Sequence, residues 1–451
     1  MFSRVCTAAG SLFLLQAPSH AHLNIPPREQ DQAVLLVGAT IHPVSRTPIS
    51  NGQMIFENGR ITGIGKTVLR PVGTHQIDLT GKHVYPGLIA GNSALGLTEI
   101  SGVPATSDLA EPGPNNPNVR AEVAVNPDSE LFPVARANGV LIVHTAPKSD
   151  GKRGVIAGTS AVLRLEGWTT EDMVVKAPAG LHVYWPKNTE RGSWGRPTAY
   201  NPSKSAKHPD RMVKILEETF DTARSYWNAK RSEYPELVTD VKWESMIPVL
   251  DRSIPVFVHA DDSTQILEAL HWAEKQEIDI VIVGGRDAWR VAEDLKEKDV
   301  PVIISPVLAL PLRRWEPANV SMANPAKLLE AGVLFAIANT GTRFGAAIER
   351  NLPYQAAAAV AHGLPADEAL RSITLNPARI LGVEDRLGSL EIGKDATFFV
   401  TDGDPLDVRT NVEMAFVDGR RIDLSTRQTR LYEKYKQKYQ QPAKRGSEGE
   451  E

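Results

Sequence analysis

Residues 255 to 283 read PVFVHADDSTQILEALHWAEKQEIDIVIV, two apolar runs separated by a helical pattern. Apolar residues recur at helical spacing between Ser263 and Gln276, and Asp262 stands where an N-cap residue belongs. The flanking runs PVFVH and IDIVIV are apolar except for His259 and Asp279, as expected for strands covered on both faces. This stretch therefore predicts a strand–helix–strand unit of an α/β protein.

The same alternation continues along the middle of the chain. The runs VPVII (300–304) and VLFAIA (333–338) are further apolar strands, and the spacing predicts an amphipathic helix over 211–230. Such a series favours parallel strands covered by helices. Closing the series gives a barrel and leaving it open gives a doubly wound sheet, and the pattern alone does not choose between them.

Both ends of the chain are instead typical of short strands. Residues 33 to 85 contain β-branched runs broken by the turn pairs Asn51-Gly52 and Asn58-Gly59, and the second pair predicts a hairpin. Residues 391 to 422 return to short strands, ATFFV and MAFVDGRRI, with a turn at Asp418-Gly419. Two such ends around one α/β unit suggest that both join in a single small sheet domain.

Composition excludes several classes of protein. With 451 residues, 42% hydrophobic content and a net charge of −4, the chain is globular and lacks the basic excess that nucleic-acid binding requires. Its one cysteine, Cys6, allows no intramolecular disulfide and no cysteine zinc cage, so any metal would need His, Asp or Glu. No run reaches the roughly 18 apolar residues of a membrane-spanning helix.

The first and last segments are set apart from the fold. Residues 1 to 21 have a basic start at Arg4, a short apolar run and a small-x-small ending at Ser19 and Ala21, which predicts a signal peptide and a secreted or periplasmic protein. A frayed N-terminus is the alternative. Residues 424 to 451 are highly charged, and we expect a surface helix followed by disorder there.

Two stretches carry a family resemblance: KHVYPGLIAGNSALG (82–96) and residues 352–407, which contain Thr374-x-Asn376-Pro377-Ala378 and Gly388-Ser389-Leu390-x-x-Gly393-Lys394-Asp395-Ala396. They resemble the amidohydrolase superfamily, in particular its imidazolonepropionase-like and dihydroorotase-like branches. The resemblance implies a (β/α)8 TIM-like barrel over 86–387 and a small β-sandwich formed from 33–85 and 388–423. It also implies a hydrolase of non-peptide carbon–nitrogen bonds in small amides. We expect Gly393 to take φ > 0 where the chain re-enters the sandwich.

The resemblance also implies where a metal would bind. In active members the first barrel strand ends in Asp-x-His-x-His, and the matching positions here are Ala90, Asn92 and Ala94. The strand-five histidine matches His259. The strand-six, strand-eight and middle-strand positions fall at Val283-Gly284-Gly285, at Asn339 or Thr340, and near His182. Because one ligand of the set is retained and metal hydrolysis needs three or more, metal-dependent catalysis is not expected.

Other candidate residues lie at predicted strand ends. His144, His182 and His259 would converge in a barrel, and zinc is a candidate cofactor only with such a rearranged site. The simpler interpretation of His259 is a histidine hydrogen-bonded to a neighbour. Two Gly-rich turns, Gly284-Gly285-Arg286 and Gly341-x-Arg343, are candidates for cradling an anion, with ordinary turns as the favoured alternative. Residues 188–208 form a long loop that is a candidate for shaping a substrate mouth.

Two functional hypotheses follow. The first keeps the chemistry that the resemblance implies, in a hydrolase of small amides with an altered site. The second, which the replaced ligands favour, is a non-catalytic barrel retained as a small-molecule-binding or oligomeric scaffold. A covalent hydrolase has no support, because the sequence contains no Gly-x-Ser-x-Gly elbow. A homodimer is the expected assembly by analogy.

Overall fold

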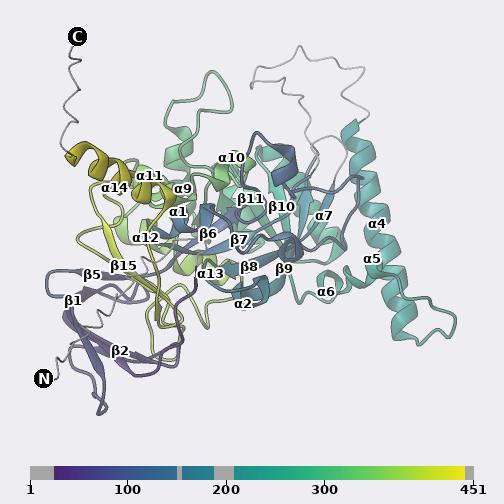
Figure 1. Cartoon of the computed structure of the whole chain (residues 1–451). Coiled ribbons are helices and arrows are strands. Elements are labelled where there is room, and N and C mark those ends of the chain that lie inside the picture. Colours follow the sequence, from purple (N-terminus) through teal and green to yellow (C-terminus); the bar gives the residue numbers. More distant parts are fainter. Residues whose placement is uncertain (1–24, 150–154, 187–207, 442–451) are drawn as a thin grey trace, which may run out of the picture.

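The structure is a computed structural model that describes residues 25–149, 155–186 and 208–441 (Figure 1). The predicted signal peptide and nearly all of the loop 188–208 lie outside these residues. Two sheets of eight strands organise the described chain, one from the middle of the sequence and one from both ends. The predicted architecture of a barrel with a separate small sheet unit is therefore confirmed.

The barrel-like sheet has the strand order β13-β12-β11-β10-β9-β8-β7-β6. Its strands are β6 (Leu88–Ser93), β7 (Val140–Thr145), β8 (Ile156–Arg164), β9 (Val174–Tyr184), β10 (Val256–Ala260), β11 (Ile280–Gly284), β12 (Val302–Ile304) and β13 (Phe335–Ile337). The α-helices that connect and cover them are α1 (Leu131–Arg136), α2 (Thr170–Met173), α4 (His208–Arg231), α5 (Val241–Glu244), α6 (Ile247–Leu250), α7 (Ser263–Gln276), α8 (Ala292–Glu297), α9 (Val320–Glu330), α10 (Arg343–Ala346), α11 (Leu352–Val360), α12 (Ala366–Arg371) and α13 (Leu375–Ile380).

The stretch that predicted the fold forms β10, α7 and β11. Helix α7 spans Ser263–Gln276 as predicted, and Asp262 caps it by accepting a hydrogen bond from the backbone N–H of Gln265 at 3.1 Å. Strands β10 and β11 pair in parallel, with Val256 opposite Ile280. This unit places His259 at the carboxyl end of β10, on the face of a barrel where chemistry is concentrated.

Strand β8 departs from the all-parallel barrel that was predicted. It pairs antiparallel with both β7 and β9, whereas the other pairs in this sheet are parallel. The connection from β8 to β9 covers only residues 165–173, and a parallel crossover needs about a dozen or more. The reversal could not be predicted from composition, because β8 is buried along its whole length.

The segment leading into α13 bridges the two edge strands of the barrel-like sheet. Ile89 in β6 donates a backbone hydrogen bond to Ile373, and Ile337 in β13 donates one to Ser372, each at 2.9 Å. The side-chain amide of Asn376 donates to a backbone oxygen of β13 at 2.9 Å. The Thr374-x-Asn376-Pro377 signature therefore has a structural role at the seam where the barrel closes.

The second sheet joins both ends of the chain, with the order β16-β15-β14-β5-β1-β2-β3 and β4 paired to β1. Its strands are β1 (Val34–Ile41), β2 (Ile49–Glu57), β3 (Arg60–Gly65), β4 (His75–Asp78), β5 (His83–Pro86), β14 (Phe398–Thr401), β15 (Val412–Val417) and β16 (Arg420–Arg421). Phe56 in β2 contacts Phe416 in β15 with ring centroids 5.5 Å apart, although three strands lie between them in the sheet. One mixed sheet therefore curls around its own core, which gives the sandwich-like unit.

The two Asn-Gly pairs of this unit behave differently. Asn58 and Gly59 both have positive φ and form the predicted hairpin turn between β2 and β3. The interpretation of Asn51-Gly52 as a turn was wrong, because both residues lie inside β2. The positive φ of Asn51 accompanies shifts in the register between β1 and β2, so this pair produces an irregularity in the strand.

The charged C-terminal segment forms helix α14 (Arg427–Gln440), none of whose residues is buried. A surface helix was predicted here, and the disorder predicted beyond it falls outside the described residues. Within the described ranges, no helix is both long enough and apolar enough to cross a membrane.

Candidate barrel-mouth site

Residues at the ends of four strands, β6, β7, β12 and β13, bring polar groups together at the mouth of the barrel. The amide of Asn92, near the end of β6, donates to the hydroxyl of Ser305, which follows β12, at 3.0 Å. The Ser305 hydroxyl in turn donates to the backbone oxygen of Asn339, which follows β13. The ammonium group of Lys148, four residues beyond His144, donates to Oδ1 of Asn92 at 3.2 Å. Asn92, the first-strand position of the resemblance, is thus held between a hydroxyl and a cation.

Gly341 allows the backbone after β13 to pass close to the Asn92 side chain. It has a φ of 59°, and a Cβ at this position would lie 2.6 Å from atoms of the Asn92 side-chain amide. Any side chain here would therefore displace Asn92 and its contact with Lys148. Of the two Gly-rich turns singled out in the sequence, this one contributes to the mouth by leaving room for Asn92.

Glu349 lies fully buried beneath this group. Its carboxylate accepts a hydrogen bond from the Ser93 hydroxyl at 2.6 Å and one from the Asn339 amide at 2.9 Å. Burial raises the pKa of Glu349 to about 7, although both hydrogen bonds and the Lys148 charge act to lower it. Burial lowers the pKa of Lys148 to about 8, opposed by the attraction of Glu349. Both groups therefore titrate near neutral pH, which is common in functional sites.

Sequence reasoning missed Lys148 and Glu349. A signal for Lys148 existed, because a lysine shortly after the predicted strand VLIVH stands on the loop side of a barrel strand. Glu349 gave no comparable signal, since it lies in the short 3-10 turn Glu349–Asn351 between α10 and α11. Its contact with Asn339 depends on how that turn folds back under β13.

The predicted histidines form a row across the neighbouring strand ends. His182 and His259 share a hydrogen bond of 2.9 Å between Nδ1 and Nε2, and His259 also stacks on Tyr184. His144 lies beside His182, with ring centroids 5.3 Å apart. Burial lowers the pKa of His144 to about 4 and lowers the pKa of His182, so both are neutral at pH 7.

These rings do not point at one common point. Both ring nitrogens of His144 are engaged, Nδ1 with the backbone oxygen of Gly91 at 2.9 Å and Nε2 with the Ser160 hydroxyl at 2.7 Å. The hydrogen bond between His182 and His259 turns one nitrogen of each ring toward the other. Within residues 25–149, 155–186 and 208–441, no group of three or more His, Cys, Asp or Glu side chains is placed to hold a metal ion.

The two remaining predicted side chains, those of Thr340 and Arg343, are exposed. Thr340 pairs with the Thr342 hydroxyl at 2.9 Å, and Arg343 lies at the start of α10. In the other Gly-rich turn, the backbone N–H of Gly285 donates to Ala260 at 2.8 Å and so is not directed at a ligand. The arrangement of this second turn is that of an ordinary connection.

A cavity of about 530 Å³ lies between the loops that follow β6 and β7, and none of the polar mouth residues named above lines it. It is lined by the loops after β6, including Leu97, Leu109 and Asn116, and by Pro147 after β7. Lys148 lies beside it, since its backbone N–H donates to Leu109 at 2.7 Å. The cavity volume suits a small molecule.

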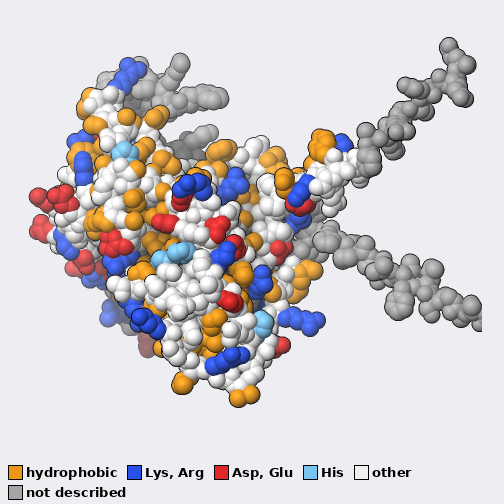
Figure 2. All heavy atoms as spheres, turned by 90° about the vertical axis from the view of Figure 1, so that its left-hand side faces the viewer, with side chains coloured by type: hydrophobic (Ala, Val, Ile, Leu, Met, Phe, Trp, Pro, Cys, Tyr) orange, Lys and Arg blue, Asp and Glu red, His pale blue; other side chains and the backbone are white. Residues whose placement is uncertain are grey.

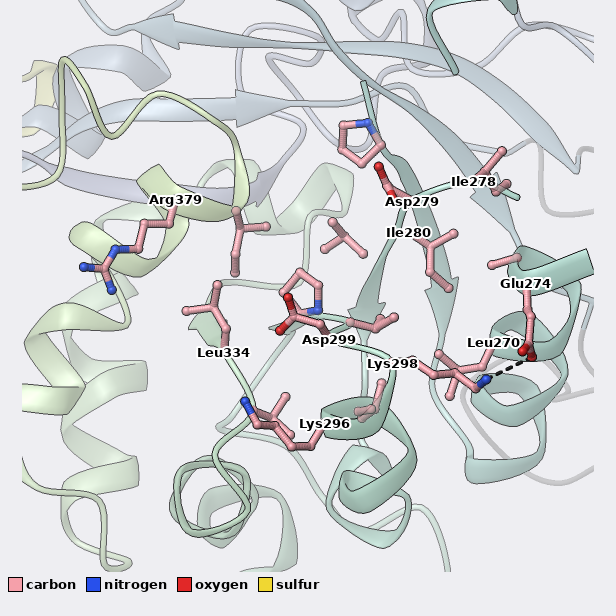
Figure 3. Close-up of a pocket in the computed structure, with 18 of the residues that line it drawn as sticks. Leu270, Glu274, Ile278, Asp279, Ile280, Lys296, Lys298, Asp299, Leu334 and Arg379 are labelled. Carbon is pink, nitrogen blue, oxygen red and sulfur yellow. Dashed lines mark hydrogen bonds and ion pairs between the residues drawn. The ribbon is translucent and has the colours of Figure 1, made fainter. Parts of the chain in front are cut away.

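Another cavity, of about 570 Å³, lies at the opposite, amino-terminal ends of β10 to β13 (Figure 3). Its rim carries ion pairs, one between Lys298 and Glu274 at 2.9 Å and one between Arg252 and Asp279. Barrel chemistry belongs to the carboxyl ends of the strands. The candidate site is therefore the mouth around Lys148.

Replacing Glu349 with glutamine should flatten the dependence of stability on pH. Because the folded-state pKa of about 7 exceeds the ordinary 4.5, stability from this group is fully present below pH 4.5 and is lost as the pH rises through 7. The loss amounts to at most about 3 kcal/mol. Glutamine cannot ionise, so the stability of the variant should rise relative to that of the wild type as the pH increases from 4.5 to above 7. Urea unfolding at pH 4.5, 6 and 8 measures the difference, and parallel curves would contradict the assignment.

The family model described as "Amidohydrolase family" matches residues 239–422. Amidohydrolase tasK of Hapsidospora irregularis is 22% identical over 394 residues, covering 82% of this chain and 39% of that protein. Imidazolonepropionase of Syntrophobacter fumaroxidans is 37% identical over 111 residues, 24% of each chain. The two matches thus cover well under half the length of either curated relative.

Among solved structures, an amidohydrolase from Thermotoga maritima MSB8 superposes with a TM-score of 0.76. It is 29% identical, and the match covers 86% of this chain and 99% of that one. The likeness therefore includes both the barrel and the sheet formed from the two ends.

Proposed function

Because the chain belongs to the amidohydrolase superfamily, we propose that its barrel mouth is a small-molecule site that works without a divalent metal. The observation that carries this proposal is the Lys148 ammonium 3.2 Å from Asn92 Oδ1, at the first-strand position of the resemblance. The mouth would bind a small amide or a related carbonyl compound through this cation.

Electrostatics supports a site free of metal. With a pKa of about 8, Lys148 is mostly protonated at pH 7 and would repel a divalent cation placed near Asn92. The flanking residues Ala90 and Ala94 have no donor atom, and His259 is engaged with His182. The metal site of the superfamily is, on this proposal, degenerate in this chain.

The same groups suit a carbonyl or carboxylate oxygen. A half-buried ammonium makes charge-assisted hydrogen bonds that are stronger than those between neutral groups. Asn92 and Ser305 fix the position of Lys148 on one side, and Glu349 balances its charge from below. The cavity beside the Lys148 backbone would receive the rest of the molecule.

The test measures binding of hydantoin, N-acetylglycine and N-carbamoylglycine by ligand-observed NMR with EDTA present. At least one probe should bind the wild type, and Lys148→Met should weaken that binding by at least about tenfold, as expected for loss of a charge-assisted contact. The control is Lys214→Met, which removes an exposed lysine of α4. Binding that requires added zinc, or that survives in Lys148→Met, would refute the proposal.

Hydrolysis of a non-peptide carbon–nitrogen bond is the second candidate. It is favoured by superfamily membership and by two groups, Glu349 and Lys148, whose pKa values lie near 7 and 8. Release of ammonia or amine from the same probes, with EDTA present, separates the two candidates. A scaffold that only binds would show binding without turnover.

We also propose secretion through the segment 1–21, on the sequence pattern alone. Cleavage after Ala21 would remove Cys6 and leave a mature chain without cysteine. N-terminal sequencing of protein recovered from the cell exterior tests this. A chain that still begins at Met1 would contradict it.

A further inference from the structure

Helix α14 presents a stripe of apolar and aromatic side chains to solvent. The exposed fractions are 40% for Leu431, 63% for Tyr432, 48% for Tyr435 and 80% for Tyr439. At 3.6 residues per turn, these four side chains fall within an arc of about 100°. The stripe is therefore one continuous face of the helix, and none of its four side chains is buried within the described chain.

Cations border the stripe on both sides. The helix contains five Lys or Arg and one Glu, whereas the whole chain has a net charge of −4. The Lys434 and Lys438 ammonium groups lie 5.9 and 6.0 Å from the centroid of the Tyr435 ring, and Lys436 lies 5.6 Å from that of Tyr432. Over the face in Figure 2, acidic and basic side chains are interspersed. The cations of α14 are thus a local concentration.

The helix has little else to stabilise it. Its N-terminal end is held by the cap at Thr426 and by an ion pair of 3.7 Å between Arg430 and Glu130. An isolated helix of fewer than about 15 residues is marginal in water. In Figure 1 it lies at the edge of the molecule, next to the C-terminal end of the described chain. Such a helix would be stabilised by a surface that covers its stripe.

We propose that α14 binds an anionic lipid surface, with the tyrosine stripe at the headgroup level and the flanking lysines toward the lipid phosphates. A narrow apolar arc bordered by Lys and Arg is the pattern of a helix that lies in the plane of a membrane interface. Tyrosine is enriched at that interface, and long cationic side chains extend from it to the headgroups. Each cation near an anionic surface adds to the attraction.

Other binding partners fit the exposed face of α14 less well. A second copy of α14 would bring five cations against five, which repel each other. Single-stranded nucleic acid would stack its bases on the ring faces, but Lys434, Lys436 and Lys438 lie over the faces of Tyr435 and Tyr432. An acidic protein would use the cations but leave the stripe without an apolar partner.

The experiment is co-sedimentation of the full chain with vesicles of phosphatidylcholine alone or mixed three to one with phosphatidylglycerol. We expect binding to the mixed vesicles, at least about tenfold weaker binding to the neutral ones, and loss in 0.5 M salt. The triple variants Lys434→Glu/Lys436→Glu/Lys438→Glu and Tyr432→Ser/Tyr435→Ser/Tyr439→Ser should each lower the partition coefficient at least about tenfold. Because α14 buries no residue, both should fold, which thermal unfolding verifies.

The matched control, Lys66→Glu/Lys214→Glu/Arg350→Glu, reverses the charge of three exposed side chains outside α14. It should bind the vesicles like the wild type.

Several outcomes would overturn the proposal. Equal binding to both vesicles, no binding to either, or full binding by the two α14 variants would each do so. Tighter binding to a single-stranded oligothymidine would assign the helix to nucleic acid. A dimer that either α14 variant dissociates would assign it to a second copy.

Discussion

Replacing Asp395 with asparagine is expected to lower the free energy of unfolding by about 3 kcal/mol, as expected for removing one partner of a buried charge cluster. The carboxylate is buried and pairs with Arg60 and Arg386, each at 2.7 Å, and with Arg164 at 3.4 Å. Arg60 lies in β3, Arg386 in the loop before β14, and Arg164 in barrel strand β8. Asp395 of the Gly393-Lys394-Asp395-Ala396 signature therefore connects the two sheets through its ion pairs with Arg60 and Arg164.

The control for this variant is Asp407→Asn. Asp407 pairs with Arg409 at 2.6 Å at an exposed position, where removing an ion pair costs at most about 1 kcal/mol. Guanidinium chloride unfolding followed by circular dichroism measures both variants. Equal effects of the two substitutions would show that Asp395 does not join the sheets.

Replacing Arg136 with methionine is expected to cost about 3 to 5 kcal/mol, the usual loss when one partner of a fully buried pair is removed. The Arg136 guanidinium, with no solvent exposure, donates to the Glu166 carboxylate and to the backbone oxygen of Leu165 at 3.0 Å. Without it, Glu166 is left as a buried acid whose pKa burial already raises. The change therefore weakens the packing of α1 against the end of β8.

The double variant Arg136→Met/Glu166→Leu distinguishes two causes of the lost stability. One is the loss of the attraction between the two side chains, and the other is the cost of a buried Glu166 carboxylate without a partner. Replacing both partners with apolar side chains removes the uncompensated carboxylate, so most of the lost stability should return. Unfolding of the single and double variants at pH 7 gives the comparison. A double variant that is no more stable than Arg136→Met would contradict this account.

The fold was predictable where the local pattern is decisive. The bounds of α7 follow from the spacing of its apolar residues and from Asp262 as its cap. The Asn58-Gly59 turn was predictable because its φ angles suit those residues. Strand β8 and the Asn51-Gly52 pair were not, because an evenly buried strand carries no sign of direction and an Asn-Gly pair also fits a strand irregularity.

Only the site residues on strands or at strand ends were predictable. Asn92, His182, His259 and Asn339 were found because the end of an apolar strand is visible in the sequence, and because the family resemblance indicates which barrel strand each one belongs to. Which of them meet was not visible, since the Asn92–Lys148 and Asn339–Glu349 contacts are made by loops and a short turn. The positions of such segments depend on packing across the barrel rather than on a repeating pattern.

The central claim is that the mouth works without a divalent metal, with Lys148 as its cation. The most direct test is elemental analysis of the protein purified without chelator, combined with probe binding before and after EDTA treatment. We predict well under one equivalent of zinc, manganese, iron, cobalt and nickel together per chain, and binding that EDTA leaves unchanged. One equivalent of any of these metals, whose removal abolishes binding, would contradict the account.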